Sequence, residues 1–453
     1  MNKSLTTAWV VLGTSALLIS GLLSVLVTGA KMPGIKQAVD IEFIQWCLVV
    51  HVNLATLIWF TALPVGLLHF STRSRSFFSS PLSWVGFVFA CAGLVLLFSV
   101  PPQEGVKPIL ANYIPVLSHE RYYLGLAVYL LGIVVSILSP KVFVNDLRLK
   151  KEWNGLYEVR FGLFIGMVFL LLAVVALGFS FKQLFKEQWL TEFRIVEVGM
   201  WGGGHLIQHA SAVFIVCCWV LLLCRQQERS VFDRRDLFLV FSGMGLPIFF
   251  VPLLLYFDVT SAEYRRGFTL LMQWGIAPSV ALFLVFAFKR LSLRLSDLKS
   301  YEFVAFALSA LLIVTGFTFG ALIRGPDLRV PGHYHASIGA VTLAFMATSY
   351  MVLAPSVSRW MLRSVWFYGI GQFIFASGMF IAGAFGTPRK TYGSEQVFTH
   401  WGQSLGIGVM AIGGIGALLG GIFFAVAIFP HLCSLKFKIE NGELCLNTKS
   451  SLG

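Results

Sequence analysis

Charged residues are scarce in this chain. Only 12% of its 453 residues are Asp, Glu, Lys or Arg, whereas 57% are hydrophobic and the mean hydropathy is +0.80. A soluble protein of this length carries about 25% charged residues, so the composition excludes an ordinary soluble domain. Acidic residues are fewer than basic ones, with 21 Asp and Glu against 34 Lys and Arg, so the formal net charge is +13. The composition is that of a membrane protein.

Cysteine motifs are also missing. None of the seven cysteines stands in a Cys-x-x-Cys-His run, so covalent attachment of a c-type haem is not expected, and no paired-cysteine copper domain is present. Most of them fall in or beside apolar stretches, where a free cysteine acts as a small hydrophobic residue. The seven are Cys47, Cys91, Cys217, Cys218, Cys224, Cys433 and Cys445.

Long apolar stretches fill most of the sequence. Twelve of them reach the length of about 20 residues that a transmembrane helix needs. Residues 6–30 are too long for the apolar part of a signal peptide and read as the first span. We predict an all-α polytopic membrane protein, a single twelve-helix domain over residues 1–453 with a short tail from about residue 436. The expected spans are 6–30, 41–70, 82–101, 121–140, 157–181, 195–224, 236–257, 266–289, 301–323, 333–355, 364–386 and 403–430.

The positive charges lie mainly in the segments between these spans, which argues against a nucleic-acid-binding role. An even number of spans places both termini on one side of the membrane. The loops and tails on that side hold about 20 Lys and Arg, against about 13 on the other side, so the positive-inside rule predicts cytoplasmic termini. We expect a multi-pass protein of the inner (cytoplasmic) membrane.

Histidines provide the clearest chemical signal. His333 and His335, at the start of the tenth span, point about 200° apart on a helix and could serve sites on opposite faces. His51 and His205 lie about ten residues into the second and sixth spans, so all four come to a similar depth in the outer half of the membrane. An ionisable residue in a span is a functional candidate by default, and histidine is the commonest haem-iron ligand.

A structural interpretation competes with this one, because a single histidine in a span often serves as a hydrogen-bond partner between helices. We keep the structural interpretation for the four histidines near helix ends or in loops, which are His69, His119, His400 and His431. For the other four, the shared depth favours cofactor binding.

The ordered histidines make the chain resemble subunit I of the heme-copper oxidase superfamily, as a divergent member similar to cytochrome c oxidase subunit I and to nitric-oxide reductases. The resemblance covers nearly the whole chain. Its motifs are His51-Val-Asn53 in span two, Trp201-Gly-Gly-Gly204-His205 in span six, His333-Tyr-His335 in span ten, the loop Asn112-Tyr-Ile-Pro115 to His119, and the loop Thr387-Pro388-Arg389-Lys390-Thr-Tyr392.

This resemblance implies two haems, expected to be of b type. His51 and His335 would hold a low-spin haem from both faces, and His333 would be the axial ligand of a high-spin haem. Arg389 and Lys390 would offset the charge of the haem propionates. His205 corresponds to the histidine that supplies the first ligand of a second active-site metal.

Two departures from the family pattern affect the second metal. The family places two adjacent histidines in span seven, where this chain, aligned on Glu263-Tyr264 and Pro278, has Leu254-Leu255. In addition, a histidine, His209, follows four residues after His205 on the same helix face, where oxidases often have a tyrosine and nitric-oxide reductases a glutamate.

Two hypotheses for the second metal remain open. In one, His205 and His209 ligate a non-haem iron or copper with a third ligand from Asp258 or Tyr256, since imidazole suits both metals and a carboxylate favours iron. In the other, no second metal binds.

The leading functional prediction is a terminal respiratory reductase of nitric oxide or dioxygen, with catalytic residues His205 and His209. Nitric oxide is slightly favoured, because that branch of the family tolerates metals other than copper and lacks the tyrosine. A separate cytochrome c or cupredoxin subunit would donate electrons, and a quinol donor is an alternative. The second hypothesis is a haem electron-transfer or sensor protein without the second metal. A transporter is a third, but the repeats and interrupted helices typical of transporters are not evident.

Overall fold

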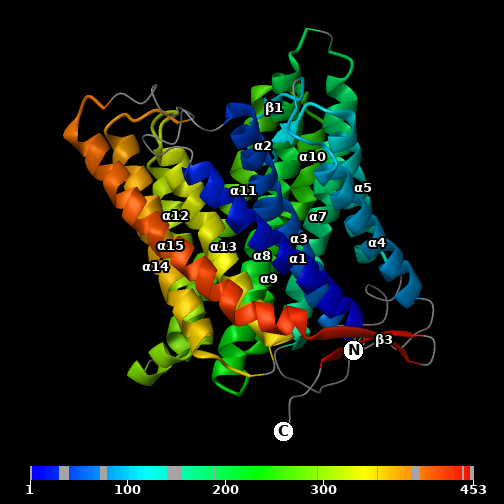
Figure 1. Ribbon diagram of the computed structural model, residues 1–453, viewed down its shortest axis with the longest axis vertical. Coiled ribbons are helices and arrows are strands. Elements are labelled where there is room, and N and C mark those ends of the chain that lie inside the picture. The colour runs from blue at the N-terminus through cyan, green and yellow to red at the C-terminus, as the bar shows by residue number, and fades with distance from the viewer. Residues whose placement is uncertain are drawn as a thin grey trace.

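Helices make up nearly all of the molecule. The computed structural model describes residues 3–29, 40–71, 79–103, 105–139, 156–187, 189–292, 294–354, 356–389, 398–440 and 443–448. Twelve of the helical segments in this part of the chain are long and apolar enough to cross a membrane. They stand side by side along the long axis of the molecule (Figure 1). The prediction of an all-α polytopic membrane protein is confirmed.

Each observed span lies within a few residues of the predicted stretch. In chain order the spans are α1 (Lys3–Gly29), α2–η1–α3 (Ile41–Val52, Asn53–Ile58, Trp59–Ser71), α4 (Ser79–Phe98), α5 (Glu120–Ile137), α7 (Leu156–Leu184), α8 (Glu192–Gln226), α9–η2–α10 (Arg234–Gly245, Leu246–Phe250, Val251–Leu255), α11 (Ala262–Arg290), α12 (Tyr301–Ala321), α13 (Arg329–Leu353), α14 (Arg359–Ala384) and α15 (Trp401–Cys433).

The remaining elements are short and lie at the two ends of the helices. Strands β1 (Pro108–Ile109) and β2 (Val116–Leu117) pair between α4 and α5, and they mark the upper end in Figure 1. At the lower end, strands β3 (Leu435–Glu440) and β4 (Glu443–Thr448) form an antiparallel hairpin that runs beside the start of α1. The 3-10 turn η3 (Leu295–Lys299) precedes α12.

Side-chain caps explain why several spans begin where they do. Thr191, Ser261 and Ser300 accept hydrogen bonds from the first-turn N–H groups of α8, α11 and α12, which would otherwise have no partner. His119 and His400 do the same at α5 and α15 through their ring nitrogens. Both histidines are thus helix caps, in keeping with the structural interpretation.

The expectation of uninterrupted spans is wrong for two of them. In the second span, a π-helical turn at Asn53–Ile58 separates α2 from α3 directly after His51. In the seventh span, a 3-10 segment at Leu246–Phe250 separates α9 from α10. Pro247 and Pro252 explain the second break, because proline has no N–H to donate within a helix and its ring clashes with the preceding turn. Single π-turns inside α-helices often occur at functional sites.

Glycines spaced by seven residues hold α14 and α15 together. A Cβ added to Gly413 would lie only 2.2 Å from the backbone nitrogen of Phe375, so the two backbones touch directly. Without a hydrophobic driving force between helices in lipid, such close approach of small residues is what drives their association. The same seven-residue spacing recurs in α4 and α5, at Gly86, Gly93, Gly125 and Gly132. In α14 and α15 the set is Gly371, Gly378, Gly406, Gly413 and Gly420.

The three spans that carry the candidate cofactor ligands are the innermost of the molecule. Within their most apolar windows, 89% of the residues of α8, 78% of α13 and 72% of α2–α3 are buried, and the next span reaches 56%. The outer spans, such as α4 and α15 with 28% each, face the surroundings. The histidines of these three helices are therefore placed at the centre of the assembly.

Gly413→Val is expected to destabilise the protein, because the added side chain must push apart two backbones in contact. Overpacking of this kind costs about 1–3 kcal/mol, and the thermal midpoint of the detergent-solubilised protein should fall accordingly. Gly421→Val is the matched control in the same helix, since a Cβ there would meet no atom within 4 Å. Equal midpoints for the two variants would contradict the role of the glycine contacts.

Candidate functional site

His51 lies in the last turn of α2 and faces α1. Its Nδ1 lies 2.8 Å from the backbone oxygen of Ser20 and 2.9 Å from the Ser20 hydroxyl. A carbonyl oxygen only accepts hydrogen bonds, so Nδ1 carries the proton and Nε2 keeps its lone pair. The Ser20 hydroxyl in turn donates to the backbone oxygen of His51 at 3.1 Å. One residue of α1 therefore fixes both the ring and the tautomer of His51.

His333 lies in the first turns of α13 and is held by α12. Its Nδ1 is 2.6 Å from the backbone oxygen of Gly316, so again Nδ1 is the donor and Nε2 is the nitrogen with the lone pair. Gly320, one turn further along α12, is required for this approach, because a Cβ there would lie 2.8 Å from Nδ1. His335 points elsewhere and packs edge-on against Phe375 of α14, with ring centroids 5.1 Å apart.

α13 and the second span are in contact, and their histidines lie at matching heights. Phe345 of α13 packs against Trp59 and Phe60 of α3, with ring centroids 5.7 and 5.8 Å apart. His51 precedes Trp59 by eight positions, and His335 precedes Phe345 by ten. At 1.5 Å per residue, the two histidines are about 12 and 15 Å from this shared contact, on spans expected to run in the same direction.

His205 is buried in α8, with 2% of its surface exposed. Its Nδ1 is 2.7 Å from the backbone oxygen of Trp201, one turn earlier, and therefore donates to it. The Thr269 hydroxyl lies 3.3 Å from Nε2, but its single proton is directed to the backbone oxygen of Arg265 at 2.8 Å. Nε2 is thus the nitrogen of His205 that keeps a lone pair.

His209 is fully buried one turn below. Its Nε2 is 2.8 Å from the backbone oxygen of Met244 in α9, and its ring stacks on Phe169 with centroids 3.9 Å apart. Nδ1 is buried and has no hydrogen-bond partner. Gly275 of α11 borders the ring, since a Cβ there would come within 2.5 Å of Cε1. A buried polar atom without a partner is costly, and it is a site where a missing ligand would be expected.

A common pattern links His51, His205, His209 and His333. Each donates one ring N–H to a backbone carbonyl oxygen, which leaves the other nitrogen with a lone pair. Metal-ligating histidines almost always make this kind of second bond, because it fixes the tautomer and the ring orientation. The four side chains therefore fit the role of haem or metal ligands.

The structure does not bring Asp258 to these histidines. Asp258 follows the end of α10 in an exposed turn, where its carboxylate accepts from the N–H of Thr260 at 2.7 Å and from its hydroxyl at 2.6 Å. Tyr256, the alternative third ligand, is 86% exposed. Among the described residues, no three His, Cys, Asp or Glu side chains are grouped so that they could hold a metal ion. Within the described ranges, His205 and His209 are therefore the candidate ligands of a second metal, without a carboxylate beside them.

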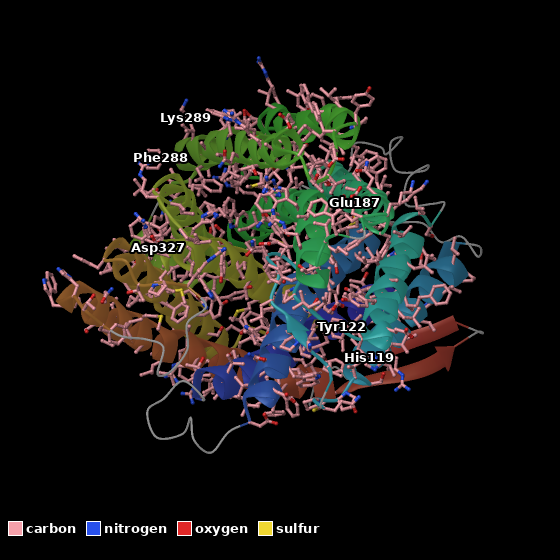
Figure 2. All side chains as sticks on the ribbon, turned by 90° about the horizontal axis from the view of Figure 1, so that it is seen from above. His119, Tyr122, Glu187, Phe288, Lys289 and Asp327 are labelled. Carbon is pink, nitrogen blue, oxygen red and sulfur yellow. The ribbon has the colours of Figure 1, made fainter. Side chains whose placement is uncertain are left out.

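The loop after α14 reaches the start of α13. Asp327 forms an isolated bridge with Pro388, and the N–H of Leu328 donates to the backbone oxygen of Thr387 at 3.0 Å. This pairing places Arg389 beside the end of α13 that carries His333. Lys390 lies outside the described residues. In Figure 2, Asp327 lies on the other side of the helix assembly from His119 and Tyr122.

Asp327 also fixes the start of α13. Its carboxylate accepts from Arg329 at 2.6–3.1 Å and from the Arg329 backbone N–H at 2.9 Å. Burial raises the pKa of Asp327, but the hydrogen bonds and charge of Arg329 outweigh it and leave the pKa below its usual value. The first turn before His333 is therefore held by a stable ion pair.

Tyr113, which the sequence analysis named only as part of the Asn112-Tyr-Ile-Pro115 loop and without a role, covers His205. It lies in the β1–β2 loop and has a positive φ of 71°, a conformation that is rare for a bulky residue and often found at functional sites. Its hydroxyl oxygen is 3.1 Å from both ring nitrogens of His205, so it lies against the face of the imidazole. Burial raises the pKa of Tyr113, which keeps the phenol protonated and able to donate.

The glycine run before His205 makes this arrangement possible. A Cβ on Gly204 would lie 2.4 Å from the Tyr113 ring, and one on Gly202 would lie 2.2 Å from the Tyr264 hydroxyl oxygen. The loop itself is anchored by Asn53, whose amide donates to the backbone oxygen of Pro115 at 2.6 Å. Three successive glycines were the signal in the sequence that other segments pack tightly around this turn of α8.

Tyr113→Asn should expose His205. Asparagine tolerates a positive φ, so the loop can keep its course while the ring that covers the imidazole is lost. Modification by diethyl pyrocarbonate, mapped by mass spectrometry, should leave His205 protected in the native chain and label it in the variant. Tyr256→Asn, at a side chain that is 86% exposed, is the control. Protection of His205 in both variants would show that Tyr113 does not seal it.

No family model matches the chain. Two of the most similar curated proteins are uncharacterized. A protein of Rickettsia prowazekii is 24% identical over 97% of this chain and 98% of its own length, and one of Aquifex aeolicus is 24% identical over 76% and 83%. The chain is also 25% identical to cytochrome c oxidase subunit 1 of Thermus thermophilus, over 80% of this chain and 71% of that protein. This is a distant similarity to one respiratory oxidoreductase subunit.

Proposed function

We propose that the chain is a haem-bearing respiratory membrane oxidoreductase subunit. In this proposal His51 and His335 hold a low-spin haem, His333 holds a high-spin haem, and nitric oxide or dioxygen is reduced at the second one. The single observation that carries it is the set of fixed tautomers, in which a backbone carbonyl oxygen holds one ring nitrogen and frees the other. The distant similarity to a cytochrome c oxidase subunit supports it.

In this proposal, some residues hold the haem ligands in place and others offset the charge of the haems. Ser20 and Gly316 hold His51 and His333 through their backbone oxygens, so neither ring can rotate or change its tautomer without losing a buried hydrogen bond. Arg389 supplies positive charge beside the start of α13. When bound, a haem with two histidines would supply one-electron transfer, and a haem with one histidine would supply an open axial position for a gas.

A second metal would be held by His205 and His209. The Nε2 lone pair of His205 and the unpartnered Nδ1 of His209 are nitrogen donors one helical turn apart, which suits iron or copper. Nitric oxide is the favoured substrate, because position 209 carries an imidazole where oxidases often have a tyrosine. An external cytochrome c, cupredoxin or quinol would supply electrons.

The second candidate function keeps the haems and omits the second metal. Asp258 is engaged with Thr260 in an exposed turn, and the described residues contain no group of three metal-binding side chains. On this observation the chain would be a haem electron-transfer or sensor protein. The number of metals bound per chain separates the two candidates.

The haem proposal predicts two b-type haems per purified chain, one of which binds carbon monoxide. Reduced-minus-oxidised spectra of His51→Ala should lose the low-spin signal, and those of His333→Ala should lose the carbon-monoxide shift, because each variant removes an axial ligand. His431→Ala, near the other end of the molecule, should keep both signals. A native protein without haem would overturn the proposal.

The second-metal hypothesis predicts non-haem iron or copper in a stoichiometric amount by elemental analysis. His209→Ala should lose this metal and retain both haems, because it removes one of the two proposed nitrogen donors. Asp258→Asn should retain the metal, since the carboxylate is turned away from the histidines. Two haems without additional metal in the native protein would favour the electron-transfer or sensor function.

A further inference from the structure

A pocket between α8 and α11 opens at the end of the molecule that carries the β1–β2 hairpin. Its volume is about 330 Å³. The lining combines an indole, two guanidinium groups, a hydroxyl and two aliphatic side chains, from Trp201, Ala262, Arg265, Arg266, Thr269 and Leu270. The proposed function gives this pocket no role, and both charged side chains that line it are positive.

The two arginines are free to bind a ligand. The structure shows no ion pair for Arg265 or Arg266 within the described part of the chain, and the single side-chain bond of Arg265 is a long one of 3.4 Å to the backbone oxygen of Ser261. The nearest acid along α8, Glu197, is paired with Arg194 and accepts from Asn112. Glu263, in the first turn of α11, does not line the pocket.

An exposed stripe continues from the pocket along α11. Arg266, Leu270 and Trp274 follow at four-residue intervals on one face, and the last two are 40% and 73% exposed. From Arg266 to Trp274 the stripe runs about 12 Å toward the middle of the span. Figure 2 shows Phe288 and Lys289, further along the same helix, pointing outward at the rim of the assembly, so α11 lies at the periphery of the helix assembly.

We propose that this pocket binds the headgroup of an anionic phospholipid. The phosphate would lie between the guanidinium groups of Arg265 and Arg266, and an acyl chain would follow Leu270 and Trp274. A guanidinium group matches a phosphate with two parallel hydrogen bonds, and an apolar stripe beside two such groups matches the acyl chain of a phospholipid. A free inorganic anion would use the arginines alone and would leave the apolar stripe without a partner.

The lipid would lie one side chain away from His205. Thr269 lines the pocket and its hydroxyl is 3.3 Å from Nε2 of His205, while Trp201 lines the pocket and accepts the other N–H of the same ring. A bound headgroup would therefore cover the α11 side of His205, just as Tyr113 covers its face. The lipid site does not depend on haem or metal being present.

The experiment is native mass spectrometry of the full chain released from nanodiscs of mixed phosphatidylglycerol and phosphatidylcholine. The native chain should retain phosphatidylglycerol selectively. The double variant Arg265→Gln/Arg266→Gln should bind it about thirtyfold more weakly, because each basic residue near an anionic surface contributes about fivefold. Arg121→Gln, in the first turn of α5 at the same end of the molecule, is the matched control and should bind normally.

Two further measurements distinguish a phospholipid headgroup from a free phosphate ion in the pocket. Inorganic phosphate added in excess should not displace the lipid if the acyl chain contributes, and Leu270→Asn should weaken retention with both arginines intact. Equal retention of phosphatidylglycerol by the native chain and the double variant would overturn the proposal. So would displacement by inorganic phosphate alone, which would make the pocket a site for a free anion.

Discussion

The hydrogen bond from a histidine ring to a backbone carbonyl oxygen is the constraint on which the centre of this molecule depends. In a helix interior most carbonyl oxygens already accept a hydrogen bond from the backbone N–H four residues later. A histidine ring can donate to the same oxygen only where small side chains let it come close to the helix backbone. Ser20, Trp201, Met244 and Gly316 supply such oxygens from α1, α8, α9 and α12. Each bond orients a ring and decides which nitrogen keeps its lone pair.

Close helix packing makes these bonds possible. Gly320 lets α12 approach His333, and Gly275 lets α11 approach His209. The glycines of α14 and α15 let the backbones of these two outer helices come into contact. The spans that carry the histidines are more buried than the rest because other helices surround them. Glycine thus serves two purposes here, in the association of the outer spans and in the positioning of the inner side chains.

Hydropathy predicted the spans well, because a membrane requires about 20 apolar residues whatever the neighbours are. The tautomers could not be predicted, since the partners of His333, His51 and His209 lie 17, 31 and 35 positions away in the sequence. The surroundings of Asp258 depend on where the helix before it ends. α10 ends at Leu255, and Asp258 follows in an exposed turn, where its carboxylate accepts from Thr260.

Tyr113 shows why the contacts of a loop side chain escape sequence reasoning even where the loop itself is recognised. A tyrosine with a positive φ is disfavoured locally, and nothing in its immediate sequence requires it. The conformation is stable only because Gly204 leaves room for the ring and Asn53 anchors the loop at Pro115. His205 is consequently covered by side chains from two other segments, Tyr113 over its face and Thr269 beside Nε2. These contacts, one from the β1–β2 loop and one from α11, keep His205 buried although the three residues before it are glycines without side chains.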